Sequence, residues 1–157
     1  MDKGNGIEVI ALFDEEYRFL SNFYESEVTY KGLTYQNSES AYQAHKFLDN
    51  HEDYTNLKPM KAKNKARKKE ESIREDWDEV KEGIMLEIVR AKFTQSEELK
   101  RLLLNTGDAY LIEGNYWGDV YWGMCDGEGD NKLGKILMKV REELRFRGWH
   151  YSKCMLY

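Results

Sequence analysis

Two carboxylates of this sequence, Glu39 and Asp119, stand at positions that suit either a structural role or acid–base chemistry. The stretch TYQNSESAYQAHKF, residues 34–47, places Glu39 at the start of a helical pattern. Glu39 either stabilises the first helical turn, with a gain of roughly 0.3 to 1 kcal/mol from the helix dipole, or exchanges a proton with a substrate. For a single carboxylate the structural role is the commoner one. The same applies to Asp119 in a polar loop, and Trp77 at the head of an apolar stripe is equally ambiguous.

The stretch EGNYWGDVYWGMCDGEGDN, residues 113–131, contains five glycines and four large aromatic residues. Glycines let a backbone approach a ligand closely, and aromatic rings offer flat surfaces for stacking. Loops longer than about twelve residues tend to be functional. Composition alone leaves two interpretations open: a ligand-binding loop, or a long loop that Tyr116, Trp117, Tyr121 and Trp122 anchor to the core.

The stretch RFLSNFYESEV, residues 18–28, sets Ser21 and Asn22 between Phe19 and Phe23. Short hydrogen-bonding side chains flanked by aromatic rings suit a site that stacks a base and binds ribose or phosphate oxygens. On composition alone, a local turn with two core phenylalanines is the favoured interpretation.

The basic run KPMKAKNKARKK, residues 58–69, carries seven lysines and arginines. A solvated helix face explains such a run better than a nucleic-acid patch does. Lys63 and Arg67 stand at i and i+4, so on a helix they face the same side and are suited to hold a phosphate.

Composition restricts the classes of protein. Of 157 residues, 34% are charged and 41% are apolar, which is typical of a folded globular protein, and the net charge of -5 disfavours a bulk electrostatic grip on nucleic acid or an anionic membrane. Neither a secretion signal nor a membrane span is recognisable. Cys125 and Cys154, with His45, His51 and His150, match no metal-ligand spacing. We therefore expect a cytoplasmic protein with no metal and no cofactor.

Hydrophobic patterning predicts the elements that position these residues. Strands are expected over 7–13 and 109–114, and a hairpin over 28–30 and 33–35. Helices are expected from Ser38, with Ala41, Ala44 and Leu48 on one face; over 60–71; along Trp77, Val80, Ile84 and Ile88; over 97–104; and over 131–144, with Leu133, Ile136, Leu137, Val140 and Leu144 on one face.

Three local signals refine these helices. Asp76 and Glu79 are spaced as a capping box, Ser96 is expected to cap the helix over 97–104, and Gly107 to stop it. The C-terminal stretch 145–157 is expected to cover the core rather than a partner. The prediction is one α+β domain over 1–157, helix-rich with a small β-sheet.

Seven blocks of this sequence, in this order, resemble the NADAR family. They are FLSNFY, TYQNSESAYQAHKF, AKNKAR, DWDEVKEGIMLEIVRAKF, LLLNTGDAYLIE, DVYWG and GDNKLGKILMKVREEL, and they run from about Phe13 to Leu144. The family includes N-glycosidases that act on early riboflavin-pathway intermediates and enzymes that remove ADP-ribose from modified bases or proteins.

The resemblance implies roles for individual positions. Glu39, Trp77 and Asp119 match the proposed catalytic set of the N-glycosidase branch. Positions implied to bind substrate are Ser21, Asn22, Phe23, Lys63, Arg67, Trp122, Gly123, Gly129 and Asn131. The sequence departs from the family pattern at Ser40, where histidine is common, at Ala66, where glycine is usual, and at Met124 and Cys125, which puts the substrate in doubt more than the reaction.

The resemblance and the carboxylates together predict a metal-independent N-glycosidase that cleaves a ribosyl C–N bond. Its substrate would be an ADP-ribosyl conjugate, such as ADP-ribosylated guanine, or a phosphoribosylamino riboflavin intermediate. The partner is then a small nucleotide-like molecule or an ADP-ribosylated nucleic acid or protein, and no membrane is expected. The aromatic stretch around Trp117 tilts the expectation slightly towards ADP-ribose. The alternatives are a non-catalytic ADP-ribose or nucleotide-binding module and a purely protein-binding domain.

Overall fold

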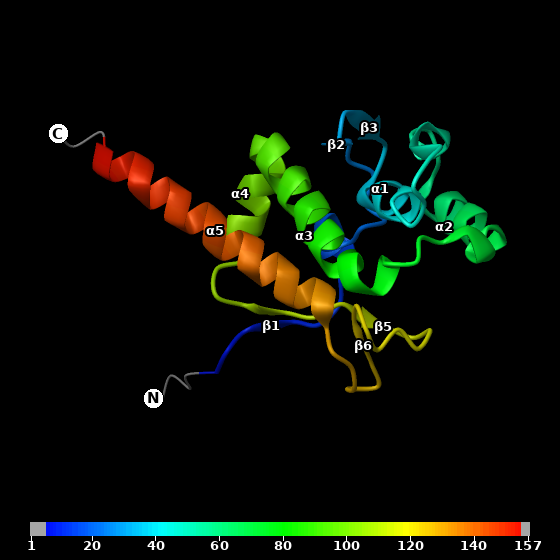
Figure 1. The fold of residues 1–157 in the computed structure, drawn as a ribbon. Coiled ribbons are helices and arrows are strands. Elements are labelled where there is room, and N and C mark those ends of the chain that lie inside the picture. The colour runs from blue at the N-terminus through cyan, green and yellow to red at the C-terminus, as the bar shows by residue number, and fades with distance from the viewer. Residues whose placement is uncertain (1–5, 155–157) are drawn as a thin grey trace.

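The computed structural model describes residues 6–154 of the chain, with only the backbone for residues 148–154. Two long helices, α3 (Trp77–Gln95) and α5 (Lys132–Cys154), lie against each other, and α4 (Glu97–Asn105) packs on both (Figure 1). Helix α1 (Ser38–Ala44) packs between α3 and α2 (Pro59–Lys68). The predicted helix-rich α+β fold is confirmed.

The strands of the described residues form three two-stranded pairs rather than the single small sheet expected. The pairs are β1 (Val9–Ile10) parallel with β4 (Tyr110–Leu111), β2 (Val28–Tyr30) antiparallel with β3 (Leu33–Tyr35), and β5 (Gly114–Asn115) parallel with β6 (Met124–Cys125). The β2–β3 hairpin is where it was predicted. Its turn residues Lys31 and Gly32 have φ values of 48° and 84°, the left-handed pair that a tight hairpin turn requires.

Three short 3-10 helices complete the chain: η1 (Glu15–Leu20), η2 (His51–Tyr54) and η3 (Glu70–Ser72). The predicted helix over 60–71 is therefore divided, because α2 ends at Lys68 and η3 follows it. Pro59 begins α2, at a position where its missing N–H costs no helical hydrogen bond.

Two local predictions are wrong. Asp76 does not form a capping box, because its carboxylate accepts hydrogen bonds from the Arg74 guanidinium at 2.6 and 2.8 Å instead. Leu48 is not on the buried face of α1, since that helix ends at Ala44 and Leu48 is 75% exposed. The Ser96 cap is confirmed, because the Ser96 hydroxyl accepts a hydrogen bond from the Leu99 N–H at 3.2 Å.

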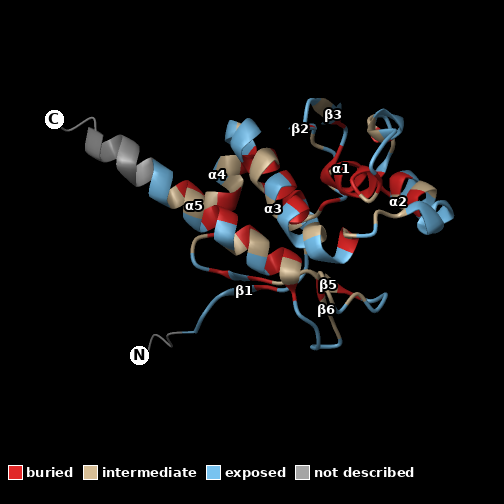
Figure 2. Cartoon of the chain, viewed as in Figure 1, coloured by how far each residue is buried: buried red, intermediate tan, exposed pale blue. Residues whose placement is uncertain are grey.

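The core runs between the helices, and α1 is buried along its whole length (Figure 2). On α5 the predicted stripe holds: Leu133, Leu137, Val140 and Leu144 are buried, and Ile136 is half-buried. The expectation for the stretch 145–157 falls mostly on side chains outside those described. None of the described helices is long and apolar enough to cross a membrane. Helix α1 is polar although it is fully buried, and its Glu39, Tyr42 and Gln43 side chains line the site described next.

Candidate active site

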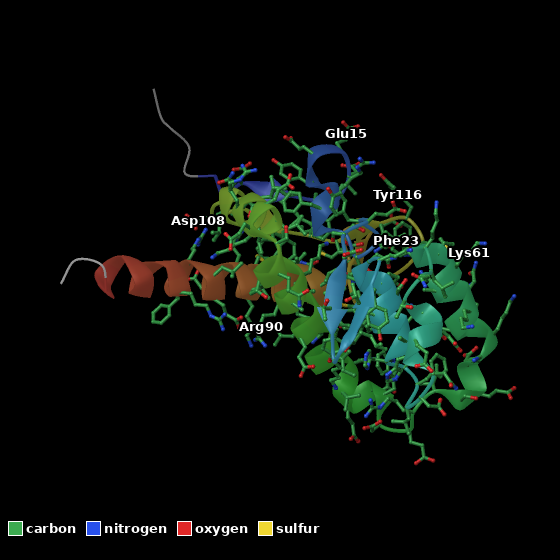
Figure 3. The ribbon with its side chains drawn as sticks, turned by 90° about the horizontal axis from the view of Figure 1, so that it is seen from above. Glu15, Phe23, Lys61, Arg90, Asp108 and Tyr116 are labelled. Carbon is green, nitrogen blue, oxygen red and sulfur yellow. The ribbon has the colours of Figure 1, made fainter. Side chains whose placement is uncertain are left out.

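A cavity of about 300 Å³ lies where α1, α3, the segment after η1 and the stretch 113–131 meet. Its lining residues are Ser21, Asn22, Phe23, Glu39, Tyr42, Gln43, Lys46, Lys63, Met85, Glu113, Trp117, Asp119, Trp122 and Leu133. Figure 3 labels Phe23, Lys61 and Tyr116 at one end of the molecule, where the segments that supply Phe23, Lys63 and Trp117 to the cavity come together. Three carboxyl groups, those of Glu39, Glu113 and Asp119, share this cavity.

Glu39 does not cap α1. That role belongs to Asn37, whose side-chain oxygen accepts a hydrogen bond from the Ser40 N–H at 2.8 Å. The Glu39 carboxyl is buried and accepts a hydrogen bond from the Gln43 amide, one turn further along, at 2.7 Å. Burial raises the pKa of Glu39 above its ordinary value, and the Gln43 amide and the charges of Lys63 and Lys46 oppose that rise. Such a carboxyl is poised to take up a proton.

Asp119 is held by the backbone of its own loop. Its Oδ1 accepts hydrogen bonds from the N–H groups of Tyr121 at 3.1 Å and Trp122 at 2.9 Å. The Asn115 side chain clamps the Asp119 backbone, donating to its carbonyl at 2.7 Å and accepting from its N–H at 2.9 Å. Backbone N–H donors are the partners of an ionised carboxylate. Asp119 therefore offers a fixed negative charge to the cavity.

Glu113 is the third carboxyl of the cavity. Its Oε2 is buried without a hydrogen-bond partner in the described part of the chain. Burial raises the pKa of Glu113 to about 8, the charges of Asp119 and Glu39 add to the rise, and Lys92 opposes it. At neutral pH this carboxyl is therefore mostly protonated.

Three of the residues implied to bind substrate, Gly123, Gly129 and Asn131, do not line the cavity. They pack behind Glu113 instead. A Cβ at Gly123 would overlap the Glu113 carbonyl oxygen, and one at Gly129, whose φ is 142°, would overlap the Gly123 carbonyl oxygen. The Asn131 side chain accepts a hydrogen bond from the Glu113 N–H at 3.0 Å and donates to the Leu111 carbonyl at 2.8 Å. These positions fix the backbone that carries Glu113.

Aromatic rings form one side of the cavity. Tyr42 lies between Trp122 and Trp77, with ring centroids 5.5 Å from the first and 5.2 Å from the second. Trp122 and Trp117 line the cavity, whereas Trp77 is buried behind Tyr42 and does not. Trp117 is 66% exposed and Tyr116 84% exposed, so the stretch 113–131 also presents aromatic surface to solvent.

The segment Ser21 to Phe23 forms the predicted local turn and also lines the cavity, but only Phe19 of the two phenylalanines is in the core, because Phe23 is 40% exposed. The Ser21 hydroxyl accepts a hydrogen bond from the Phe23 N–H at 3.1 Å, which is the local turn, and all three residues still line the cavity. The segment is anchored by Lys92, a buried residue whose ammonium donates to the carbonyls of Phe19 at 2.6 Å and Ser21 at 2.9 Å.

The basic run is mostly a solvated face, as predicted: α2 buries only Pro59, Ala62 and Ala66. Lys63 lines the cavity, and Arg67 is exposed and does not. The second cation of the cavity is Lys46, whose pKa is lowered by burial while the nearby Glu39 opposes that change. Two ammonium groups beside an acidic cavity are suited to a phosphate.

The lining residues that the sequence did not predict at the site are Tyr42, Gln43, Lys46, Met85, Glu113 and Leu133, the last of which was expected only in the core. Gln43 and Lys46 follow Glu39 at i+4 and i+7, so the predicted helical period was a signal for both, although α1 ends at Ala44 and Lys46 lies in the turn that follows it. Glu113 ends the strand pattern AYLIE just before the first glycine of the loop, and only its position at a buried strand end marked it. Within the described residues, no group of three or more His, Cys, Asp or Glu side chains is arranged to hold a metal ion.

The sequence has close relatives. N-glycosidase YbiA from Escherichia coli (strain K12) is 40% identical over 134 residues, covering 83% of each chain. N-glycosidase Npun_R5314 from Nostoc punctiforme is 35% identical, covering 83% of this chain and 88% of the relative. The riboflavin biosynthesis protein VVA0006 from Vibrio vulnificus is 40% identical over 139 residues, covering 84% of this chain and 37% of that protein.

The fold has a solved counterpart. The NMR structure of the Escherichia coli protein YbiA superposes with a TM-score of 0.81 at 36% identity, covering 92% of this chain and 89% of that one. The NADAR domain model matches residues 12–145, which include every residue that lines the cavity. By sequence, fold and family model, this chain belongs to the NADAR domain family.

Proposed function

We propose that this protein hydrolyses the C–N bond between a ribosyl group and a nitrogen base or amine. The observation that carries the proposal is the convergence of Glu39, from a buried helix, and Asp119, from a distant loop, on one cavity. The names of the relatives, N-glycosidase in two of three, support an N-glycosidase function in general.

The chemistry of this bond explains the need for two carboxylates. Cleavage passes through an oxocarbenium-like state, so a negative charge must lie close to the sugar ring and a water must lose a proton. Asp119, held by two backbone N–H groups, supplies the charge. Glu39 accepts the proton from water, since its raised pKa brings the carboxyl towards the operating pH.

The cavity selects the ribosyl part of the substrate. A volume of about 300 Å³ is at the lower end of the range for ligand cavities, so it suits a ribosyl group with its phosphate rather than a complete dinucleotide. Lys46 and Lys63 are the cations available to the phosphate. The remainder of a larger substrate would lie outside, against exposed rings such as Trp117 and Tyr116.

The exposed rings make an ADP-ribosyl conjugate, such as ADP-ribosylated guanine, our first substrate class. The second class is the phosphoribosylamino intermediates of riboflavin synthesis, which are smaller than an ADP-ribosyl conjugate and therefore suit the small cavity better, and which the name of the Vibrio vulnificus relative favours. Hydrolysis of either requires no metal step, and we expect the activity to survive dialysis against a strong chelator; its loss would remove metal independence from the proposal.

Trp77 is proposed as a positioning residue, because it supports the Tyr42 ring rather than the substrate. Trp77→Phe should then raise KM and change kcat little. A large fall in kcat with an unchanged KM would return Trp77 to the catalytic set.

The direct test is a substrate panel. Purified protein is incubated with ADP-ribosylated guanine DNA and, separately, with ribosylaminopyrimidine phosphates, and released sugar and base are quantified by mass spectrometry. Glu39→Gln should lose roughly 10²- to 10⁴-fold in kcat, the usual contribution of a general base. The matched control is Glu128→Gln, which changes an exposed glutamate of the stretch 113–131.

The panel also separates the binding-module alternative. If the wild type releases no product from any substrate, and both wild type and Glu39→Gln bind ADP-ribose equally in isothermal titration, the enzyme proposal fails. Absence of both turnover and nucleotide affinity would favour a protein-binding domain.

A further inference from the structure

We propose that Glu113 is the general acid that delivers a proton to the departing nitrogen. The inference rests on the proposed function and assigns a role within the same cavity that Glu39 and Asp119 leave unfilled. An amine or amide nitrogen is a poor leaving group as an anion, so a third group must protonate it while the bond breaks.

The first support is geometric. Glu113 lines the cavity together with Glu39 and Asp119, and it comes from the buried strand end that the Asn131 side chain and the Gly123 contact hold in place. Two separate packing constraints thus fix the backbone from which this side chain enters the site. An acid must be held in a fixed position relative to the bond it assists.

The second support is the set of hydrogen bonds. Glu39 accepts from the Gln43 amide and Asp119 from two backbone N–H groups. Among the described residues no hydrogen bond to a Glu113 side-chain oxygen is found, and its Oε2 is buried. An ionised carboxylate in that position would be costly, whereas a neutral carboxyl is tolerated. A substrate nitrogen entering the cavity supplies the missing partner.

The third support is the surrounding charge. The ionisable groups that act on Glu113 are Asp119, Glu39 and Lys92. The two carboxylates favour its protonated form, as in other sites where neighbouring carboxyl groups differ in protonation. Lys92 is the opposing cation, but its ammonium donates to the Phe19 and Ser21 carbonyls, and no ion pair joins it to Glu113 among the described residues. Lys46 and Lys63 act on Glu39, where they lower the pKa.

The step balances without a further reactant. The C–N bond breaks, its electron pair goes to nitrogen, and the Glu113 proton forms the new N–H bond. Water then bonds to the ribosyl carbon and gives a proton to Glu39. Transfer of that proton through solvent to Glu113 restores the starting state, and the products are a free sugar hydroxyl and the released amine or base.

The test compares two leaving groups in the same protein. One substrate is a ribosylamine phosphate from the panel that the wild type turns over, and the other is 4-nitrophenyl riboside 5-phosphate, whose nitrophenolate departs without a proton. Glu113→Gln should slow the first by about 10²- to 10⁴-fold and the second little. Glu128→Gln, the exposed control, should slow neither.

If Glu113→Gln does not fold, a pH profile of the wild type tests the same inference. The kcat of the amine substrate should fall at alkaline pH as Glu113 loses its proton, and the nitrophenyl substrate should lack that limb. Equal slowing of both substrates in the variant, or the same alkaline limb for both in the wild type, would show that Glu113 is structural and overturn the inference. Failure of the wild type on every substrate of the panel, ADP-ribosylated guanine DNA included, would instead refute the proposed function.

Discussion

Glu39 lies on a buried helix with an amide partner one turn away, whereas Glu113 and Asp119 come from an irregular, glycine-rich stretch and are fixed by backbone contacts. We call the first side the helical wall (Glu39, Tyr42, Gln43 and Lys46) and the second the loop wall (Glu113, Trp117, Asp119 and Trp122). A helix places side chains by its period, so the helical wall needs few special residues. The loop wall depends on residues that never reach the cavity.

This difference explains how one cavity holds carboxyl groups in different states. On the helical wall, the Gln43 amide and nearby lysines offset part of the rise in pKa that burial causes at Glu39. On the loop wall, two backbone N–H groups donate hydrogen bonds to Asp119. At Glu113, burial and the negative charges of Asp119 and Glu39 all raise the pKa. In the proposed mechanism, the two walls supply a proton acceptor, a fixed charge and a proton donor to a single bond.

The largest effect is expected from Asp119→Asn. An asparagine oxygen still accepts from the Tyr121 and Trp122 N–H groups, so the loop should keep its shape while the charge is lost. We expect kcat to fall by about 10²- to 10⁴-fold, with the free energy of unfolding changed by no more than about 0.5 kcal/mol. Steady-state kinetics and chemical denaturation measure the two quantities. Unchanged kcat would mean that the loop wall contributes no charge to the reaction.

A second effect concerns stability against pH. The pKa of Glu113 is about 8 in the folded chain and 4.5 as the ordinary value, so folding keeps a proton that the unfolded chain loses between these two pH values. The wild type should therefore lose stability as pH rises from about 4.5 to 8. Glu113→Gln should lack this loss, and its advantage above pH 8 should reach a few kcal/mol, since each pKa unit corresponds to about 1.4 kcal/mol.

Urea denaturation of both proteins at several pH values measures this difference. The charges of Asp119, Glu39 and Lys92 act on the same carboxyl, so wild type and variant are compared at each pH rather than along one curve. Parallel curves for the two proteins would exclude a raised pKa at Glu113.

The smallest effect is expected on stability, from a substitution at a glycine that supports the loop wall. Gly123→Ala would force the Glu113 carbonyl to move, and such overpacking costs about 1 to 3 kcal/mol. The matched control is Gly83→Ala within α3, where a Cβ meets nothing within 4 Å, and which should stabilise by about 0.5 to 1 kcal/mol. Thermal unfolding compares the two, and equal shifts would show that Gly123 is not a packing constraint.

The two walls also differed in what the sequence predicted. The helix from Ser38, the hairpin before it, and the meeting of Glu39 with Asp119 follow from periodicity, turn chemistry and the family resemblance. Gln43 and Lys46 were within reach of the same period. Glu113 was not, because its importance comes from burial and from the backbone contacts of Gly123 and Asn131, which only the folded loop creates.

The wrong predictions have a similar origin. Asp76 fits the spacing of a capping residue, but a stronger local partner, the Arg74 guanidinium, takes its carboxylate. The binding role of Arg67 stays a prediction: Lys63, one turn before it on α2, lines the cavity, whereas Arg67 is exposed and does not line it. Spacing along a helix shows which residues share a face, and packing decides where that face points.

We propose above that Glu113 holds a proton in the cavity that it shares with the negatively charged Asp119. Carbon-13 NMR of the glutamate side-chain carboxyl groups, titrated from pH 4 to 10 in wild type and Glu113→Gln, tests it most directly. We expect one resonance that is missing in the variant and whose titration midpoint lies near the pKa of about 8 given above for Glu113. A Glu113 resonance that titrates near the ordinary pKa of a glutamate, about 4.3, would contradict it.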